Sequence, residues 1–272
     1  MRPLAIVGNL SRDLVGGGPP RVGGAPFYAA RALRVLGRPA VVATKCAAVD
    51  RPELVPPLVA LGVPVRSRGG KSTATFAYEY DGDVRRMRVE ALGDPWTEED
   101  AHGWVSEALG RIEWVHVGAL ARSDFPPGTL AALAGRGRTV SLDGQGLVRP
   151  ARTGTLELNA DFDRDVLQHV AILKLAEEEA ELLAPGLDEG ALSSLGVSEV
   201  VITLGSRGAA VLAGGRLERI AARPVTGEID PTGAGDAFAA AYLAARSEGH
   251  APLASARRAT ALVAGLLSAR LR

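Results

Sequence analysis

The residues best suited to chemistry lie near the C-terminus, in residues 229–238 with the sequence IDPTGAGDAF. A Gly-Ala-Gly turn that opens into a helix leaves backbone N–H groups without partners at the positive end of the helix dipole. Because small side chains let an anion approach, the turn suits a phosphate or a developing oxyanion. Asp236 falls in the first helical turn, where a carboxylate can take a proton from an incoming hydroxyl. The alternative is a plain helix start, with Asp230 and Thr232 as caps.

The elements that must position this turn alternate between strands and helices. An apolar run at 4–7 predicts a buried strand, residues 25–36 repeat apolar positions at helical spacing, and residues 40–44 again favour a strand. This βαβ order is typical of a parallel sheet covered by helices. Further strands are expected at 114–117, 139–142, 171–174 and 200–204, a hairpin at 209–220, and helices at 52–61, after Thr97, and at 128–134, 177–183, 234–247 and 253–271.

One segment interrupts the alternation. Residues 73–80 and 84–89 alternate polar and apolar side chains, and Asp81-Gly82-Asp83 between them favours a hairpin turn. Half-polar strands do not suit the middle of a buried parallel sheet, so the hairpin is expected to project as a flap. Because Phe76 and Tyr78 would then be exposed on a ribbon that is marginally stable alone, we expect homodimerisation through the flap.

Composition excludes several classes of protein. The chain has 272 residues, with 31 Lys+Arg against 31 Asp+Glu, and it lacks the basic excess of a nucleic-acid binder. Hydrophobic residues make up 47%, which is enough for a large core. A single cysteine, Cys46, fits a reducing compartment. With an early apolar run too short for a signal peptide and no long apolar span, we expect a cytoplasmic protein without a membrane partner.

The motif Asp230-Pro-Thr-Gly-Ala-Gly-Asp236 resembles the C-terminal signature of the ribokinase-like (PfkB) family of carbohydrate and nucleoside kinases. Other parts of the chain agree in order and spacing. Gly23-Gly24 before an Ala-rich helix resembles the family's di-glycine signature, and the hairpin 73–89 resembles its β lid. Residues 201–208 resemble the strand and turn that line its nucleotide site.

The resemblance covers nearly the whole chain and implies a single α/β domain over residues 1–272. It implies a three-layer ribokinase-like fold with a mostly parallel central sheet and a small inserted β lid at about 63–91. Residues 10–22 are a candidate further part of the lid.

The resemblance also implies ATP-dependent phosphorylation of an alcohol group, with Mg²⁺. Asp236 would be the catalytic base on the acceptor hydroxyl. The backbone amides of Gly233, Ala234 and Gly235 would form the anion hole. These roles agree with the reading of the residues themselves, because phosphoryl transfer depends on positioning and charge stabilisation.

Further residues receive roles from the resemblance or from their positions. Asp13 lies where related kinases bind sugar hydroxyls, and Gly23 and Gly24 would let a sugar approach the backbone. Gln145 and Arg149 follow a strand at the edge of the sheet where α/β ligand sites collect, so they are candidate substrate contacts. The candidate nucleotide contacts are Lys174, Thr203, Gly205, Gly208 and Thr232.

Magnesium handling departs from the family pattern. Glu179 matches the glutamate of the family's Asn-x-x-Glu pair, but Ala176 stands where the asparagine is usual. Glu179 is therefore the candidate metal ligand, with a solvated helix face as the alternative. Ala256 and Thr260 are the candidates for an adenine pocket.

The sequence leaves the substrate open. A small sugar or polyol kinase is the main hypothesis, and a nucleoside kinase or a non-catalytic sugar- or nucleotide-sensing relative are the alternatives. Phe27-Tyr28 stands where ribose kinases typically offer a polar asparagine, which disfavours ribose. An inositol-like polyol, a keto-sugar acid and a nucleoside all stay open.

Overall fold

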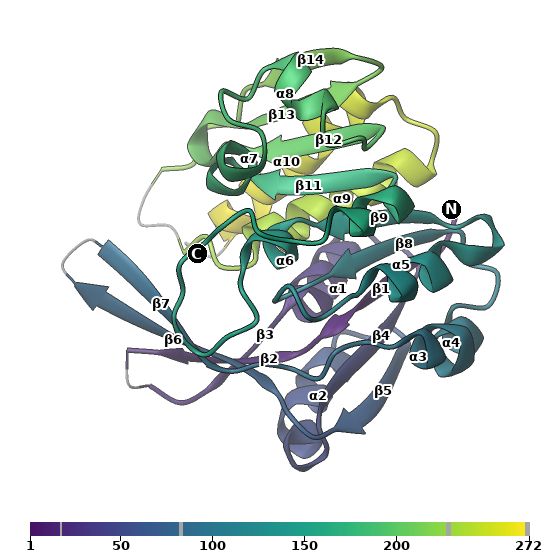
Figure 1. The fold of residues 1–272 in the computed structure, drawn as a ribbon, viewed down its shortest axis with the longest axis vertical. Coiled ribbons are helices and arrows are strands. Elements are labelled where there is room, and N and C mark those ends of the chain that lie inside the picture. Colours follow the sequence, from purple (N-terminus) through teal and green to yellow (C-terminus); the bar gives the residue numbers. More distant parts are fainter. Residues whose placement is uncertain (17, 82–83, 227–229, 270–272) are drawn as a thin grey trace.

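A nine-stranded sheet crosses the molecule, and a five-stranded sheet lies against its edge (Figure 1). The computed structural model describes residues 1–16, 18–81, 84–226 and 230–269. In spatial order, the large sheet contains β14 (Arg216–Ile220), β13 (Ala209–Ala213), β12 (Glu199–Thr203), β11 (Ile172–Ala176), β9 (Thr139–Asp143), β8 (Trp114–Gly118), β1 (Leu4–Asn9), β4 (Ala40–Ala47) and β5 (Val65–Gly70).

The large sheet is mostly parallel, as expected. Neighbouring strands from β12 to β5 pair in parallel, and within the described part of this sheet only the β12–β13 and β13–β14 pairs are antiparallel. Strand β1, which lies between β8 and β4, is buried along its whole length. Ala5 and Val7 join the core on one face, while Leu4 and Ile6 join the core on the other. A strand that is covered on both faces therefore reads as a continuous apolar run.

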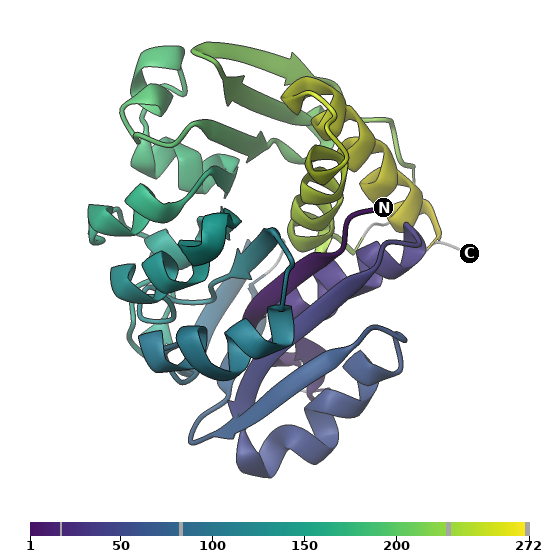
Figure 2. The same cartoon turned by 90° about the vertical axis from the view of Figure 1, so that its right-hand side faces the viewer.

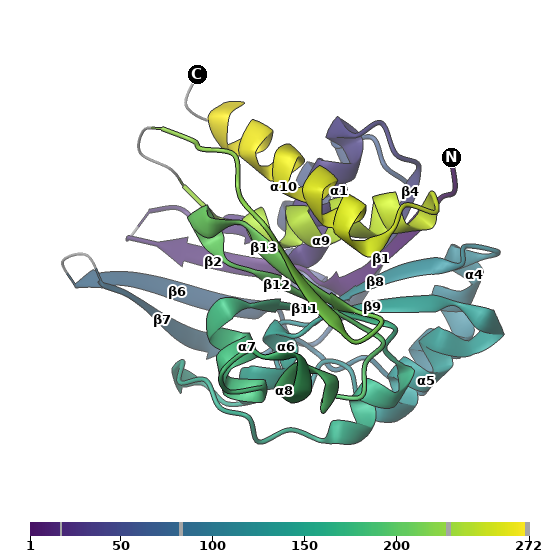
Figure 3. The same ribbon diagram turned by 90° about the horizontal axis from the view of Figure 1, so that it is seen from above.

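Helices cover both faces and complete the expected three layers (Figures 2 and 3). One face carries α1 (Ala25–Val35), α2 (Arg51–Val59), α9 (Ala234–Ser247) and α10 (Pro252–Ala269). The other carries α3 (Glu98–Asp100), α4 (Ser106–Leu109), α5 (Pro127–Ala134), α6 (Gln145–Val148), α7 (Glu177–Leu183) and α8 (Glu189–Ser193), with a six-residue 3₁₀ segment, η4 (Arg164–His169), beside α5. The helix expected after Thr97 is broken at Gly103, whose ψ of −114° is not helical.

The small sheet supplies the lid. Its order is β10 (Gly154–Thr155), β7 (Val84–Ala91), β6 (Ala74–Asp81), β2 (Ser11–Val15) and β3 (Arg21–Gly23). Residues 65–70 form β5 in the large sheet, so the inserted hairpin begins only at Ala74 and not at the expected residue 63. The 10–22 segment contributes β2 and most of β3 to the small sheet. The hairpin turn expected at 81–83 falls largely outside the described residues.

The expected exposure of the lid's aromatic side chains is wrong. Phe76 is only 3% exposed and packs with Ala74, Val89 and Leu120, and Tyr78 is half-buried against the same cluster. The strands β2 and β10 flank the hairpin, so it is part of a wider sheet whose apolar face is covered within the chain. The exposed aromatic side chains on which the prediction of a lid-mediated dimer was based are therefore not present.

In the described part of the chain, no helix is long and apolar enough to cross a membrane.

Candidate active site

A cavity of about 250 Å³ lies between the small sheet, the strand ends of β9 and β11, and the start of α9. It is lined by nine of the residues expected in the site: Asp13, Gly24, Gln145, Arg149, Lys174, Thr232, Gly233, Gly235 and Asp236. It also brings in residues that are not among the predicted site residues: Ser11, Tyr28, Met87, Leu120, Asp143, Glu178 and the hairpin residues Phe76 and Tyr78. Segments far apart in the chain thus converge on one cavity.

The first turn of α9 has the backbone that an anion site requires. Gly233 caps the helix with a left-handed φ of 75°, and a Cβ there would collide with the ring of Tyr28. Gly235 faces Lys174, so that a Cβ on Gly235 would lie 3.0 Å from Nζ of Lys174. The N–H of Ala234 already donates to the carbonyl oxygen of Pro231 at 2.9 Å. The start of α9 therefore places the positive end of a helix dipole beside the Lys174 ammonium, an arrangement that favours an anion.

A buried ion pair holds that ammonium in place. Lys174 and Asp143 lie directly opposite each other on the neighbouring strands β11 and β9, with Nζ 3.3 Å from Oδ2. Burial alone would lower the pKa of Lys174, but the carboxylates of Asp143, Glu179 and Asp236 raise it overall. Lys174 therefore stays charged at the start of α9.

Asp236 is a buried carboxyl group whose pKa is raised. Burial, followed by the charge of Asp143, raises its pKa to about 7, although Lys174 and Arg149 oppose the rise. A catalytic base works best when its pKa lies near the working pH. The side chain can therefore accept a proton near neutral pH.

The acceptor side of the cavity is built around Asp13. This carboxylate lies in β2 and accepts a hydrogen bond from Ser11 Oγ at 2.9 Å. Gly23, on the neighbouring strand β3, does not line the cavity. A Cβ on Gly23 would lie 2.3 Å from Asp13 Oδ2 and 2.5 Å from Ser11 Oγ. Because Gly23 has no side chain, the carboxylate of Asp13 fits beside it. The sequence instead predicts that Gly23 lets a sugar approach the backbone.

Gln145 and Arg149 reach the cavity from opposite ends of α6. The backbone N–H of Gln145 donates to Asp143 Oδ1 at 3.1 Å. The guanidinium of Arg149 lies over the ring of Phe76, 5.6 Å from its centroid. This contact joins the end of α6 to the small sheet. Burial lowers the pKa of Arg149 from its ordinary value.

A second cavity, of about 600 Å³, adjoins the first and shares Pro231 and Gly235 with it. Thr203, Gly205 and Gly208 line it, as expected for the donor site, whereas Lys174 and Thr232 line the first cavity. Thr260 of α10 also lines it, and its buried Oγ1 has no hydrogen-bond partner within the described chain. The remaining lining is largely apolar: Ala222, Pro224, Val225, Phe238, Val263, Ala264 and Leu267.

Glu179, the candidate metal ligand, is buried behind the site. Its Oε2 accepts the N–H of Ala176 at 2.7 Å, so that it caps α7, and it lines neither cavity. The glutamate that faces the acceptor cavity is Glu178. Across the described residues, no group of three or more His, Cys, Asp or Glu side chains is placed to hold a metal.

Comparisons with known proteins agree with this architecture. Residues 148–268 match the family described as pfkB family carbohydrate kinase. A pyrophosphate-dependent kinase in the ribokinase family, solved with a pyrophosphate analogue and myo-inositol, superposes with a TM-score of 0.82 at 24% identity over 97% of this chain and 94% of the other. Ribokinase from Arabidopsis thaliana, complexed with ribose and ATP, has a TM-score of 0.75 at 22% identity and covers 97% and 92%. A putative ribokinase II from E. coli, in complex with ATP and Mg²⁺, has a TM-score of 0.70 at 19% identity and covers 98% and 93%.

The chain therefore has the ribokinase-like fold. The resemblance to the ribokinase-like (PfkB) family is confirmed, for the family domain over residues 148–268 and for the fold over nearly the whole chain.

The contact between Gly235 and Lys174 gives a direct test of the anion site. Gly235→Ala places a methyl group 3.0 Å from Nζ of Lys174, so it should displace the ammonium, weaken the buried ion pair with Asp143 and lower phosphate affinity and activity. Gly265→Ala is the matched control, because Gly265 lies in α10 with open space beside it. Thermal unfolding and titration with inorganic phosphate measure both effects. If Gly235→Ala leaves the phosphate affinity unchanged, Lys174 does not take part in anion binding.

The raised pKa of Asp236 predicts a pH-dependent gain in stability for Asp236→Asn. Between about pH 4 and pH 7 the folded protein holds a proton at Asp236 that the unfolded chain releases, so the wild-type free energy of unfolding falls as pH rises through this window. Asparagine carries no charge, and the variant should be more stable by on the order of 2 kcal/mol at pH 8. The gain should shrink towards pH 4. Denaturant unfolding at both pH values checks this, with the exposed Glu157→Gln as control.

Proposed function

We propose that the protein transfers the γ-phosphoryl group of ATP to a hydroxyl group of a small sugar or polyol. The observation that carries the proposal is the meeting of two unlike cavities at the first turn of α9. The polar cavity contains Asp236 and the larger, mostly apolar cavity lies beyond Gly235. An acceptor hydroxyl in the first and the phosphates of a donor in the second would meet beside the anion site.

The geometry supports a direct displacement. The acceptor O–H gives its proton to the carboxylate of Asp236, and the acceptor oxygen forms a bond to the γ-phosphorus. The bond from that phosphorus to the bridging oxygen breaks, and ADP leaves with the electron pair. The N–H groups at Gly233 and Gly235 and the ammonium of Lys174 stabilise the charge on the transferring group.

Mg²⁺ is supported by the charge of the site. Four carboxylates line the described part of the acceptor cavity, Asp13, Asp143, Glu178 and Asp236, against the two cations Lys174 and Arg149. Mg²⁺ commonly binds through one or two carboxylates together with substrate phosphates, so it needs no preformed protein cluster. Glu178 would hold the ion, with the buried Glu179 behind it, and the ion would neutralise charge on the donor phosphates.

The nature of the second cavity supports ATP as the donor. A purine and ribose suit an apolar cavity of about 600 Å³ with one buried hydroxyl, Thr260 Oγ1, to pair with. Pyrophosphate is the second candidate, because a structural neighbour of the same fold is pyrophosphate-dependent. Pyrophosphate carries no group that would fill the apolar part.

The acceptor cavity favours a compact polyhydroxylated ring. Carboxylates and a guanidinium pair with hydroxyl groups, while the rings of Tyr28, Phe76 and Tyr78 provide apolar faces.

A nucleoside acceptor and a sensing role without catalysis stay as alternatives. A cytoplasmic location and a homodimer through the lid also stay predictions, and size-exclusion chromatography tests the dimer.

Catalysis should depend on Asp236. In a coupled assay of ADP release across a panel of sugars, polyols and nucleosides, Asp236→Asn should lower kcat on the order of 10²–10⁴-fold while ligand binding is retained. The wild-type kcat/KM should fall as pH drops below about 7, because Asp236 becomes protonated. Glu157→Gln should match the wild type. Full turnover in Asp236→Asn would refute the base, and binding without turnover by the wild type would favour the sensor.

Donor choice should depend on the second cavity. Ala264→Trp places an indole in this cavity from α10, and it should raise the KM for ATP at least tenfold while the KM for the acceptor changes little. Initial rates with ATP and with pyrophosphate measure this. If Ala264→Trp leaves the KM for ATP unchanged, or if only pyrophosphate supports turnover, ATP is not the donor bound in this cavity.

A further inference from the structure

The segment that carries Arg149 is held by hydrogen bonds to three consecutive carbonyl groups. Arg122 Nε donates to the carbonyl oxygen of Leu147 at 3.0 Å, and the backbone N–H of Arg122 donates to that of Arg149 at 3.0 Å. The backbone N–H of Asn159 donates to the carbonyl oxygen of Val148 at 3.0 Å. Residues from two distant segments therefore fix the end of α6.

Arg122 and Asn159 are also joined to each other. Arg122 Nη2 donates to the backbone oxygen of Asn159 at 3.0 Å and to its Oδ1 at 2.6 Å. Asn159 Oδ1 accepts a further hydrogen bond from the N–H of Asp161 at 3.1 Å. A planar guanidinium offers several donors in a fixed geometry, which lysine cannot reproduce. We call Arg122 and Asn159 the clamp.

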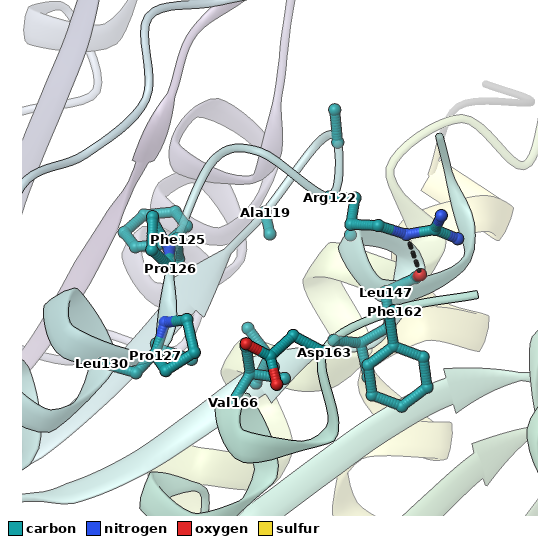
Figure 4. A pocket seen from close by; sticks show the side chains of 13 residues that line it. Ala119, Arg122, Phe125, Pro126, Pro127, Leu130, Leu147, Phe162, Asp163 and Val166 are labelled. Atoms are coloured by element: carbon teal, nitrogen blue, oxygen red, sulfur yellow. Dashed lines mark hydrogen bonds between the residues drawn. The ribbon is translucent and has the colours of Figure 1, made fainter. Parts of the chain in front are cut away.

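Gly146 and Leu147 border a cavity on the side away from the acceptor cavity, so side-chain packing there contributes less to holding the segment than the hydrogen bonds of the clamp do. A cavity of about 190 Å³ lies there between α5, α6 and η4, and Gly146 and Leu147 form part of its wall (Figure 4). Its other lining residues are mainly apolar, among them Phe125, Leu130, Phe162 and Val166. Atoms that border a cavity lose dispersion contacts on that side. The position of the segment therefore depends on the hydrogen bonds of the clamp.

The front of the same segment faces the acceptor cavity. The guanidinium of Arg149 lies over Phe76 and close enough to Asp143, Glu179 and Asp236 for their charges to act on it. A shift of the Arg149 backbone would move this guanidinium relative to the acceptor.

We propose that Arg122 and Asn159 are positioning residues that hold Arg149 against the acceptor. The effect on catalysis rests on the proposed function, whereas the effect on the geometry of Arg149 does not. Arg122 itself lines the rear cavity and not the acceptor cavity, so it acts only through the segment 147–149.

A double-mutant cycle tests the kinetic part. Arg122→Gln should raise the acceptor KM about tenfold and leave the donor KM within twofold. In an Arg149→Gln background, adding Arg122→Gln should cause no further rise, because residues that act through one contact are not additive. Asn159→Ala, which keeps the backbone N–H to Val148, should raise the acceptor KM by a smaller factor. Arg152→Gln, which removes an exposed ion pair with Glu157, is the control. Additive effects, or a lower Tm with an unchanged acceptor KM, would overturn the proposal.

A crystal structure of the Arg122→Gln protein tests the clamp apart from any kinase activity. The guanidinium of Arg149 should leave its place over the ring of Phe76. An unmoved Arg149 would refute the clamp even if the protein is a kinase. If the variant does not fold, the same comparison is made with Asn159→Ala. A moved Arg149 together with an inactive wild type would support the clamp and refute the proposed function.

Discussion

The buried ion pair between Lys174 and Asp143 is the interaction on which the site depends. A buried charge is costly unless it is paired, and here the partners face each other across neighbouring parallel strands. The pair fixes an ammonium beside Gly235 at the positive end of α9, where an anion is expected. It also places a carboxylate near Asp236 that adds to the effect of burial, and together they raise the pKa of Asp236 to about 7. One strand register thus sets both the ammonium at the start of α9 and part of the pKa shift of Asp236.

The rest of the fold brings the polar cavity and the mostly apolar cavity together beside this ion pair. The large sheet delivers Asp143 from the end of β9 and Lys174 from the middle of β11, and Phe76 and Tyr78 of the small sheet line the same cavity. The second cavity approaches from the other side of Gly235. Because the local charge comes from one lysine, one arginine and a helix terminus, phosphate chemistry is compatible with a chain that has 31 basic and 31 acidic residues.

Much of this arrangement could be predicted from local sequence. The α9 helix begins and ends where the Ala-rich pattern predicts, and the βα order predicts a parallel sheet, because both signals depend on residues close in the chain. The exposure of Phe76 could not be predicted, since it depends on Leu120 and on the strands that flank the hairpin. Gly23 likewise makes room for Asp13 across a strand pair. Asp143 and Lys174 each follow an apolar run in the sequence, which is a signal of a buried charge, but their pairing depends on the register of β9 and β11.

The central claim is that Asp236 is a base tuned by the Lys174–Asp143 pair. The most direct measurement is the pH dependence of kcat/KM for the wild type and for Asp143→Asn, with the same acceptor and donor. Removing the Asp143 carboxylate takes away a charge that raises the pKa of Asp236 and leaves Lys174 to lower it. The acidic limb of the profile should therefore move to lower pH in Asp143→Asn. An acidic limb that stays in place would contradict the account.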